Sequence, residues 1–132
     1  MKITADTNVL IRAITGDDDK QCRVAQAQLA KADMVAIAIP VLCELVWVLS
    51  QGYKSSSAEI AETIRRLMNG ANVVVNRPAA EAGLALLDAG GDFADGVIAY
   101  EGNWLGAVTF VSFDKKAVRL MDRQGKSTRL LS

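Results

Sequence analysis

Residues 34–50, MVAIAIPVLCELVWVLS, decide how this chain is expected to fold. Met34 to Ile39 is an apolar run of strand length, and Pro40 follows it directly. Proline is well tolerated at the first helical position, where no N–H group is needed, so a helix is expected to start there. Val41 to Ser50 then stays apolar for about three helical turns. The segment therefore predicts a strand that leads straight into a largely buried helix.

The same alternation of short apolar runs and longer helical patterns continues on both sides of this segment. Ser56 and Glu59 have the spacing of a capping box at the start of the next helix. Asp17 to Asp19 is expected to be a solvated loop. Strands are predicted at 2–5, 34–39, 72–75, 107–111 and 128–131, and helices at 8–15, 21–32, 41–50, about 57–69, 78 to about 90, 92–104 and 115–123.

Strands that are regularly separated by helices imply right-handed crossovers and parallel pairing. The predicted fold class is α/β, a three-layer α/β/α sandwich with a mainly parallel central sheet. A chain of 132 residues with 51% hydrophobic content is long enough for one core and too short for two comfortable domains. We therefore expect a single domain over residues 1–132.

The composition of the chain limits which catalytic chemistry is possible, but it does not identify a binding partner. Fifteen basic residues balance 15 acidic ones, so net charge alone attracts neither nucleic acid nor an anionic membrane. The chain has no histidine, which removes the usual general base and the commonest zinc ligand. The first residues lack the pattern of a secretory signal, and no apolar run has the length of a membrane span. A cytoplasmic protein is expected.

Several acidic side chains fall where a functional site is expected. Ligands of open parallel sheets bind beyond the carboxyl ends of the strands, and Asp6 and Asp114 follow the first and fourth predicted strands. Glu44 is the only charge in its apolar helix, so it must be desolvated at a considerable cost or face a polar pocket. Asp95 lies in the first turn of a later helix, with Asp92 at the helix start.

Each acid also has a purely structural explanation. Asp6, Asp92 and Asp114 could each cap a helix. Asp95 could complement a helix dipole, and Glu44 could pair with an internal arginine. Because all of these explanations would have to hold at once, a shared function is the better hypothesis.

A cluster of such acids would require a cation. Two carboxylates about 4 Å apart repel each other by about 4 kcal/mol at an effective dielectric constant near 20. A site made only of oxygen ligands suits Mg²⁺ or Mn²⁺ and disfavours zinc. These ions stabilise phosphoryl oxygens and lower the pKa of bound water, which then attacks phosphorus as hydroxide. The acids therefore predict the hydrolysis of a phosphodiester by a nuclease-type mechanism.

Four short motifs resemble those of PIN-domain proteins, and in particular of the VapC-type toxins of toxin–antitoxin modules. They are DTNVL at 6–10, VLCELVWVL at 41–49, DFADGVIA at 92–99 and FDKK at 113–116, so the resemblance covers almost the whole chain. The resemblance implies that four acids bind metal and catalyse the reaction: Asp6, Glu44, Asp95 and Asp114. Asp92 competes with Asp95 as a metal ligand. Asn8 and Ser112 would be polar supports behind these acids.

The same resemblance implies a metal-dependent endoribonuclease that inhibits growth or translation until an antitoxin neutralises it. It also implies a homodimer and an antitoxin that blocks the acidic pocket. Gly96 stands where the family usually has alanine. Trp47 could contribute to a protein interface, but its apolar neighbours favour a place in the core.

Basic side chains gather after Asp114. Lys115, Arg119 and Arg123 are four residues apart and would line one helical face. With Lys116, and with Arg12 near the first acid, they form a candidate track for RNA phosphates. An ordinary solvated face is the alternative interpretation.

Two functions from other classes compete with the nuclease hypothesis. A haloacid-dehalogenase-like phosphatase also has an aspartate after its first strand, but it needs a second aspartate where this chain has Asn8. The stronger alternative is a non-catalytic PIN-like binding domain that acts through protein partners. In that case, removing the acids would leave function intact.

Overall fold

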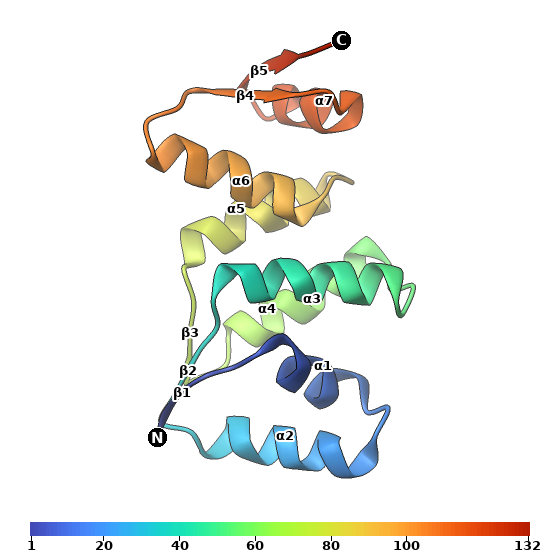
Figure 1. Ribbon diagram of the computed structural model, residues 1–132, viewed down its shortest axis with the longest axis vertical. Coiled ribbons are helices and arrows are strands. Elements are labelled where there is room, and N and C mark those ends of the chain that lie inside the picture. Colours follow the sequence, from blue (N-terminus) through green and yellow to red (C-terminus); the bar gives the residue numbers. More distant parts are fainter. The chain divides into compact units, whose positions relative to one another are not determined.

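The computed structural model describes residues 1–132, and the chain divides into two compact units, Met1–Asn76 and Arg77–Ser132 (Figure 1). The first unit contains β1 (Lys2–Thr4), α1 (Thr7–Thr15), α2 (Asp19–Lys31), β2 (Met34–Ala36), α3 (Ile39–Gln51), α4 (Ser57–Met68) and β3 (Val73–Val74). The second contains α5 (Arg77–Asp88), α6 (Phe93–Trp104), β4 (Thr109–Ser112), α7 (Lys115–Arg123) and β5 (Ser127–Leu130).

The three strands of the first unit form a parallel sheet in the order β1-β2-β3. Ile3 is opposite Val35 in one pairing, and Val35 is opposite Val73 in the other. Each connection between neighbouring strands runs through two helices, because parallel strands cannot be joined by a tight turn. The sheet thus directs the starts of α1 and α3 from adjacent strand ends.

Local sequence explains where several of these helices begin and end. Pro40 lies in the first turn of α3, as predicted. The capping box of α4 is complete, since Ser56 and Glu59 each accept a hydrogen bond from the other's backbone N–H. Helix α1 ends at Gly16, whose φ of 68° is the left-handed conformation that glycine adopts most easily.

The core of the first unit is formed by the apolar faces of its helices together with β2. Helix α1 packs against α2 and α3, and α3 packs against α4 (Figure 1). The largest fully buried side chains of this unit are Leu10, Val35, Leu42, Leu45 and Ile64. The buried residues of α3 recur at helical spacing, so one face of this apolar helix is buried and the other is not.

The second unit is built around the α5–α6 pair and a two-stranded parallel sheet. Strands β4 and β5 pair from Thr109–Ser127 to Ser112–Leu130, with α7 as the crossover between them. Leu86 of α5 packs with Leu120 and Met121 of α7, and Ala99 of α6 and Phe110 of β4 lie against this cluster. These contacts join α5, α6, α7 and β4 in one core.

Two glycines allow α5 and α6 to approach closely. A Cβ atom on Gly96 would lie 2.5 Å from the carbonyl oxygen of Ala82, which is too short for a non-bonded contact. A Cβ atom on Gly83 would lie 2.7 Å from the ring of Phe93. The glycine at position 96 therefore matches the close packing of this helix pair.

The α/β class, the element order and the parallel pairing are confirmed by the structure. Helix α2 begins at Asp19, earlier than predicted, because the Asp18 carboxylate caps it by accepting a hydrogen bond from Gln21 N at 2.9 Å. The three-layer arrangement and the single domain stay predictions. None of the seven helices combines the length and the apolar character that a membrane span requires.

Candidate acidic site

The first predicted acid, Asp6, lies between β1 and α1 and caps the helix. Its Oδ1 atom accepts a hydrogen bond from Thr7 N at 2.7 Å. The side chain is exposed, and its Oδ2 atom takes part in no hydrogen bond. Capping therefore uses one carboxylate oxygen of Asp6 and leaves the other available to a ligand.

Glu44 of α3 is held close to the start of α1. The hydroxyl group of Thr7 donates a hydrogen bond to Oε1 of Glu44 at 2.8 Å. Thr7 is the only buried polar side chain of the chain, at 7% exposure, whereas Glu44 itself is exposed. Glu44 is therefore not desolvated, and its second oxygen, Oε2, stays available. No arginine pairs with it.

Two acids of the second unit are also N-caps. Asp92 begins α6, and its Oδ1 atom accepts a hydrogen bond from Ala94 N at 3.0 Å. Asp114 begins α7, and its Oδ1 atom accepts from Lys116 N at 3.0 Å and from Ala117 N at 3.1 Å. In both residues the Oδ2 atom is left without a hydrogen bond.

Asp95 differs from the other acids because its carboxylate has no hydrogen-bond partner at all. It lies in the first turn of α6 and is partly buried. Burial, and then the negative charges of Asp92 and Asp114, raise the pKa of Asp95 above the usual value of 3.8. The three acids of this unit are thus close enough to affect one another. A cation at this position would relieve the repulsion.

The structure brings Asp6 together with Glu44 through Thr7 in the first unit, and Asp92, Asp95 and Asp114 together in the second. Within neither unit do three acidic or thiol side chains lie close enough to enclose a metal ion. The donor chemistry nevertheless fits Mg²⁺ or Mn²⁺, because every free donor atom in these groups is a carboxylate oxygen.

The two predicted polar supports occupy different surroundings. The hydroxyl of Ser112 accepts a hydrogen bond from Asp114 N at 2.9 Å and so fixes the turn that presents this acid. Asn8 is exposed, and its side chain forms no hydrogen bond. Sequence reasoning missed Thr7, although it stands between Asp6 and Asn8 in the first motif. The sequence feature that could have identified Thr7 is a polar side chain at the start of a helix that packs against the core.

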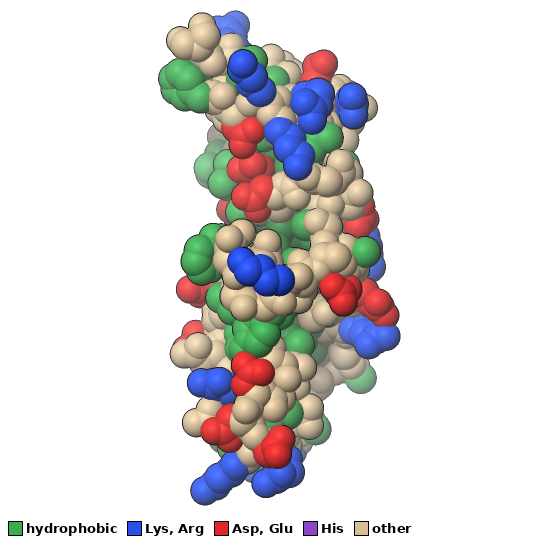
Figure 2. All heavy atoms as spheres, turned by 90° about the vertical axis from the view of Figure 1, so that its right-hand side faces the viewer, with side chains coloured by type: hydrophobic (Ala, Val, Ile, Leu, Met, Phe, Trp, Pro, Cys, Tyr) green, Lys and Arg blue, Asp and Glu red, His purple; other side chains and the backbone are tan.

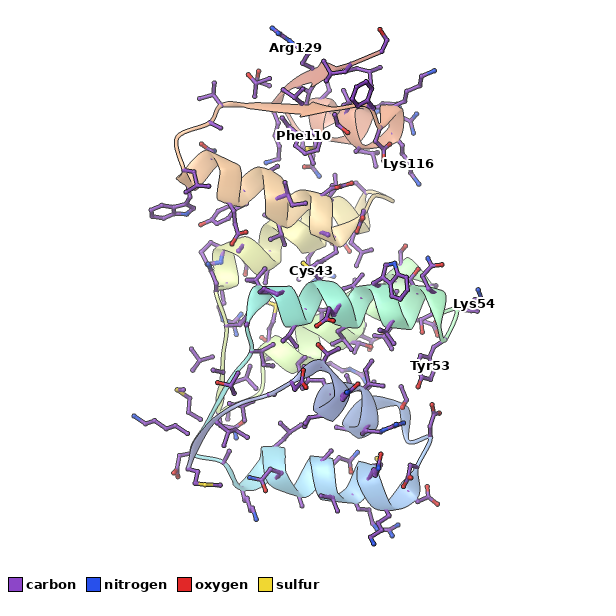
Figure 3. All side chains as sticks on the ribbon, viewed as in Figure 1. Cys43, Tyr53, Lys54, Phe110, Lys116 and Arg129 are labelled. Carbon is purple, nitrogen blue, oxygen red and sulfur yellow. The ribbon has the colours of Figure 1, made fainter.

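The predicted basic track lies on α7. Lys115, Lys116, Arg119 and Arg123 are all exposed, and Figure 2 shows Lys and Arg side chains gathered over this helix beside a group of acids. Lys116 projects from the start of α7, whereas Arg129 projects from β5 (Figure 3). Asp114 caps the same helix. Positive side chains therefore flank an acid of the candidate site.

Trp47 is 65% exposed, so the predicted place in the core is wrong. The residues of α3 that are buried near it are Leu42, Leu45, Val46 and Leu49. Glu44 and Trp47 are three residues apart and share the opposite, solvent-facing side of the helix. Because α3 is apolar overall, its composition did not show which face of the helix is buried.

Comparison with known proteins identifies one family. Residues 3–122 match the family model of the PIN domain. This match covers nearly the whole chain and includes all the acids described above. A search of curated proteins finds none that matches the chain. PIN domains are generally metal-dependent nucleases, and the family commonly uses Mg²⁺.

Proposed function

The chain belongs to the PIN-domain family, and we propose that it is a metal-dependent endoribonuclease that hydrolyses RNA phosphodiester bonds. The observation that carries this proposal is Asp95, a partly buried carboxylate without a hydrogen-bond partner among other acids. Such an arrangement is unfavourable when no cation is bound, because no hydrogen bond offsets the burial of the charge. A bound divalent cation would offset it.

The residues that would hold the ion are Asp6, Glu44, Asp95 and Asp114, with Asp92 as a further candidate. Bound Mg²⁺ or Mn²⁺ would supply charge neutralisation at the phosphate and a water of lowered pKa. The protein's own part is positioning. Thr7 fixes Oε1 of Glu44, and the helix caps fix Oδ1 of Asp6 and Asp114. Because one oxygen of each carboxylate is held by a hydrogen bond, the second oxygen is also restricted in position.

Substrate binding is proposed to rest on the basic residues near these acids. Lys115, Arg119 and Arg123 share one face of α7 and would contact successive phosphates, with Lys116 at the helix start. Arg12 would serve the same purpose on α1. The chain has few aromatic residues, at 5%, which favours recognition through phosphates and shape over extensive base stacking.

We further propose that the protein is the toxin of a VapC-type toxin–antitoxin pair, with an antitoxin and a second copy of the chain as partners. The motif resemblance supports this finer assignment, and the exposed Trp47 is consistent with a protein interface. The same exposed tryptophan favours the second candidate, a non-catalytic binding domain. The two functions differ in whether the acids are needed.

The test is the cleavage of a mixed cellular RNA pool by the purified, antitoxin-free protein in Mg²⁺, Mn²⁺ or EDTA. The proposal predicts cuts that require the metal and that disappear in Asp6→Asn. Unchanged RNA under every condition, from protein shown to be folded by circular dichroism, would favour the binding domain instead. The same digests, sequenced at their new ends, would identify the target.

A further inference from the structure

A groove of about 700 Å³ lies between α1 and α2, entirely within the first unit. Its apolar surface comes from Val9, which is partly buried, and from Val24, which is 62% exposed. The volume is within the range of small-molecule sites, roughly 300–1,000 Å³. The groove starts at Asn8, two residues from Asp6, so its near end adjoins one of the proposed catalytic acids.

Two glutamine side chains line the groove without any partner in the protein. Gln21 and Gln28 are seven residues apart, about two turns, and therefore lie on the same face of α2. Neither side chain forms a hydrogen bond. Gln26, on another face, donates a hydrogen bond to Ala13 O at 2.9 Å. Each free amide offers both donors and an acceptor, the groups needed to bind the edge of a nucleic-acid base.

The charges of the groove suit one phosphate group. Arg12 and Lys20 both line it, and Asp18 is the only acid that does. The carboxylate of Asp18 keeps its negative charge while it caps α2 through Gln21 N at 2.9 Å. With two cations against this one acid, the lining of the groove carries a net positive charge. A small apolar patch, two free amides and two cations match the ring, the edge and the phosphate of a nucleotide.

We propose that this groove binds one unpaired RNA base next to the cleaved phosphate, and that Gln21 and Gln28 determine which base is accepted. This inference rests on the proposed ribonuclease function. An apolar helix of a protein partner fits less well, since such a helix needs a continuous apolar stripe. The groove offers Val24 as its one well-exposed apolar side chain.

The first experiment measures binding. Fluorescent single-stranded RNA hexamers that differ in one central base would be titrated into the Asp95→Asn protein, which should not cut them. We expect base discrimination of about tenfold, the magnitude typical of a paired amide contact, and its reduction to under about threefold in Gln21→Ala and Gln28→Ala. Arg12→Ala should weaken all the hexamers equally, because a phosphate contact does not depend on the base. Gln51→Ala, an exposed glutamine on α3, is the matched control.

The second experiment maps cut sites by sequencing in the otherwise unchanged protein. The glutamine variants should lose base preference beside the cut. Hexamer discrimination without any cleavage would support the groove and overturn the nuclease function. Cleavage with unchanged base preference in both glutamine variants would overturn the groove. Loss of self-association in these variants, with base preference intact, would also overturn it and identify a protein interface.

Discussion

Glu44 and Asp95 are both acids on helices of largely apolar sequence, yet their surroundings differ. Glu44 is exposed and held by the Thr7 hydroxyl at 2.8 Å. Asp95 is partly buried, has no hydrogen-bond partner, and has a raised pKa because of burial and of its two acidic neighbours. One carboxylate is positioned by the fold, whereas the other is destabilised by it.

This difference indicates two kinds of contribution to the proposed metal binding. A hydrogen bond from a buried donor sets the direction of Glu44 before any ligand arrives. The unrelieved repulsion around Asp95 makes a cation favourable there, since binding removes an existing cost.

The largest effect is expected for Asp95→Asn. Loss of this carboxylate should lower RNA cleavage by at least about 100-fold, because a metal contributes several kcal/mol to phosphate charge stabilisation. The metal-free variant should at the same time be more stable than the wild type at neutral pH. Cleavage kinetics and urea denaturation of both proteins measure these effects. Lower activity combined with lower stability would indicate that Asp95 is merely structural.

The raised pKa of Asp95 also predicts how the stability of the protein changes with pH. Because the pKa of Asp95 is raised in the folded state, its favourable contribution is present below the unfolded value and is lost as pH rises through the folded value. Metal-free wild type should therefore lose stability relative to Asp95→Asn as pH rises above the usual 3.8. Parallel denaturation midpoints of the two proteins between acid and neutral pH would contradict this.

A nearly equal loss of activity is expected for Asp6→Asn and Asp114→Asn, but with little change in stability. Asparagine caps helices as well as aspartate does, so the free energy of unfolding should change by less than about 0.5 kcal/mol. If these residues were only caps, the variants would keep full activity. Cleavage assays with calorimetric unfolding separate the two roles.

An intermediate effect is expected for the contact that positions Glu44. Thr7→Val keeps the shape but removes the hydroxyl, and should lower kcat about tenfold, as is typical for residues behind metal ligands. Thr7→Ser retains the hydroxyl and should recover most of that loss. Equal kcat values for the valine and serine variants would show that the hydrogen bond does not matter for catalysis.

Two glycines of α6 should respond in opposite directions to the same substitution. Gly96→Ala should destabilise the protein by about 1–3 kcal/mol, because its Cβ would overlap Ala82 O. Gly102→Ala has open space and should stabilise it by up to about 1 kcal/mol through helix propensity. Denaturant unfolding gives both values. A neutral Gly96→Ala would contradict the close α5–α6 packing that presents Asp95.

The smallest effect is expected for single cations of α7. Arg119→Gln should weaken RNA binding equally for all sequences and reduce the slope of log affinity against log salt by about 0.7–1. Lys31→Gln on α2 is a matched exposed control and should leave the slope unchanged. Equal slopes for the two variants would favour an ordinary solvated face on α7.

Sequence patterns were sufficient to predict the order of helices and strands and to single out the individual acids. The capping box at Ser56 and the helix starts at Asp92 and Asp114 depend on local rules, and the structure has all of them. The strand predicted at 34–39 is shorter, Met34–Ala36, because α3 already begins at Ile39. The family match at 3–122 agrees with motifs that were visible in the sequence.

Contacts between distant segments could not be predicted in the same way. The bond from Thr7 to Glu44 spans 37 residues and depends on how α1 meets α3. The raised pKa of Asp95 depends on its burial and on the negative charge of Asp114, which comes from another helix. Trp47 was misplaced because apolar composition does not reveal which face of a helix is buried, although the position of Glu44 three residues earlier marked the exposed one.

The most direct test of the central claim, that the acids hold a divalent cation, is Mn²⁺ binding followed by electron paramagnetic resonance without RNA. Wild type and Asp122→Asn, an acid on the exposed face of α7, should bind Mn²⁺ with the same affinity. Asp95→Asn should bind it at least about tenfold more weakly. Equal affinities in all three proteins, or no binding by the wild type, would contradict the account.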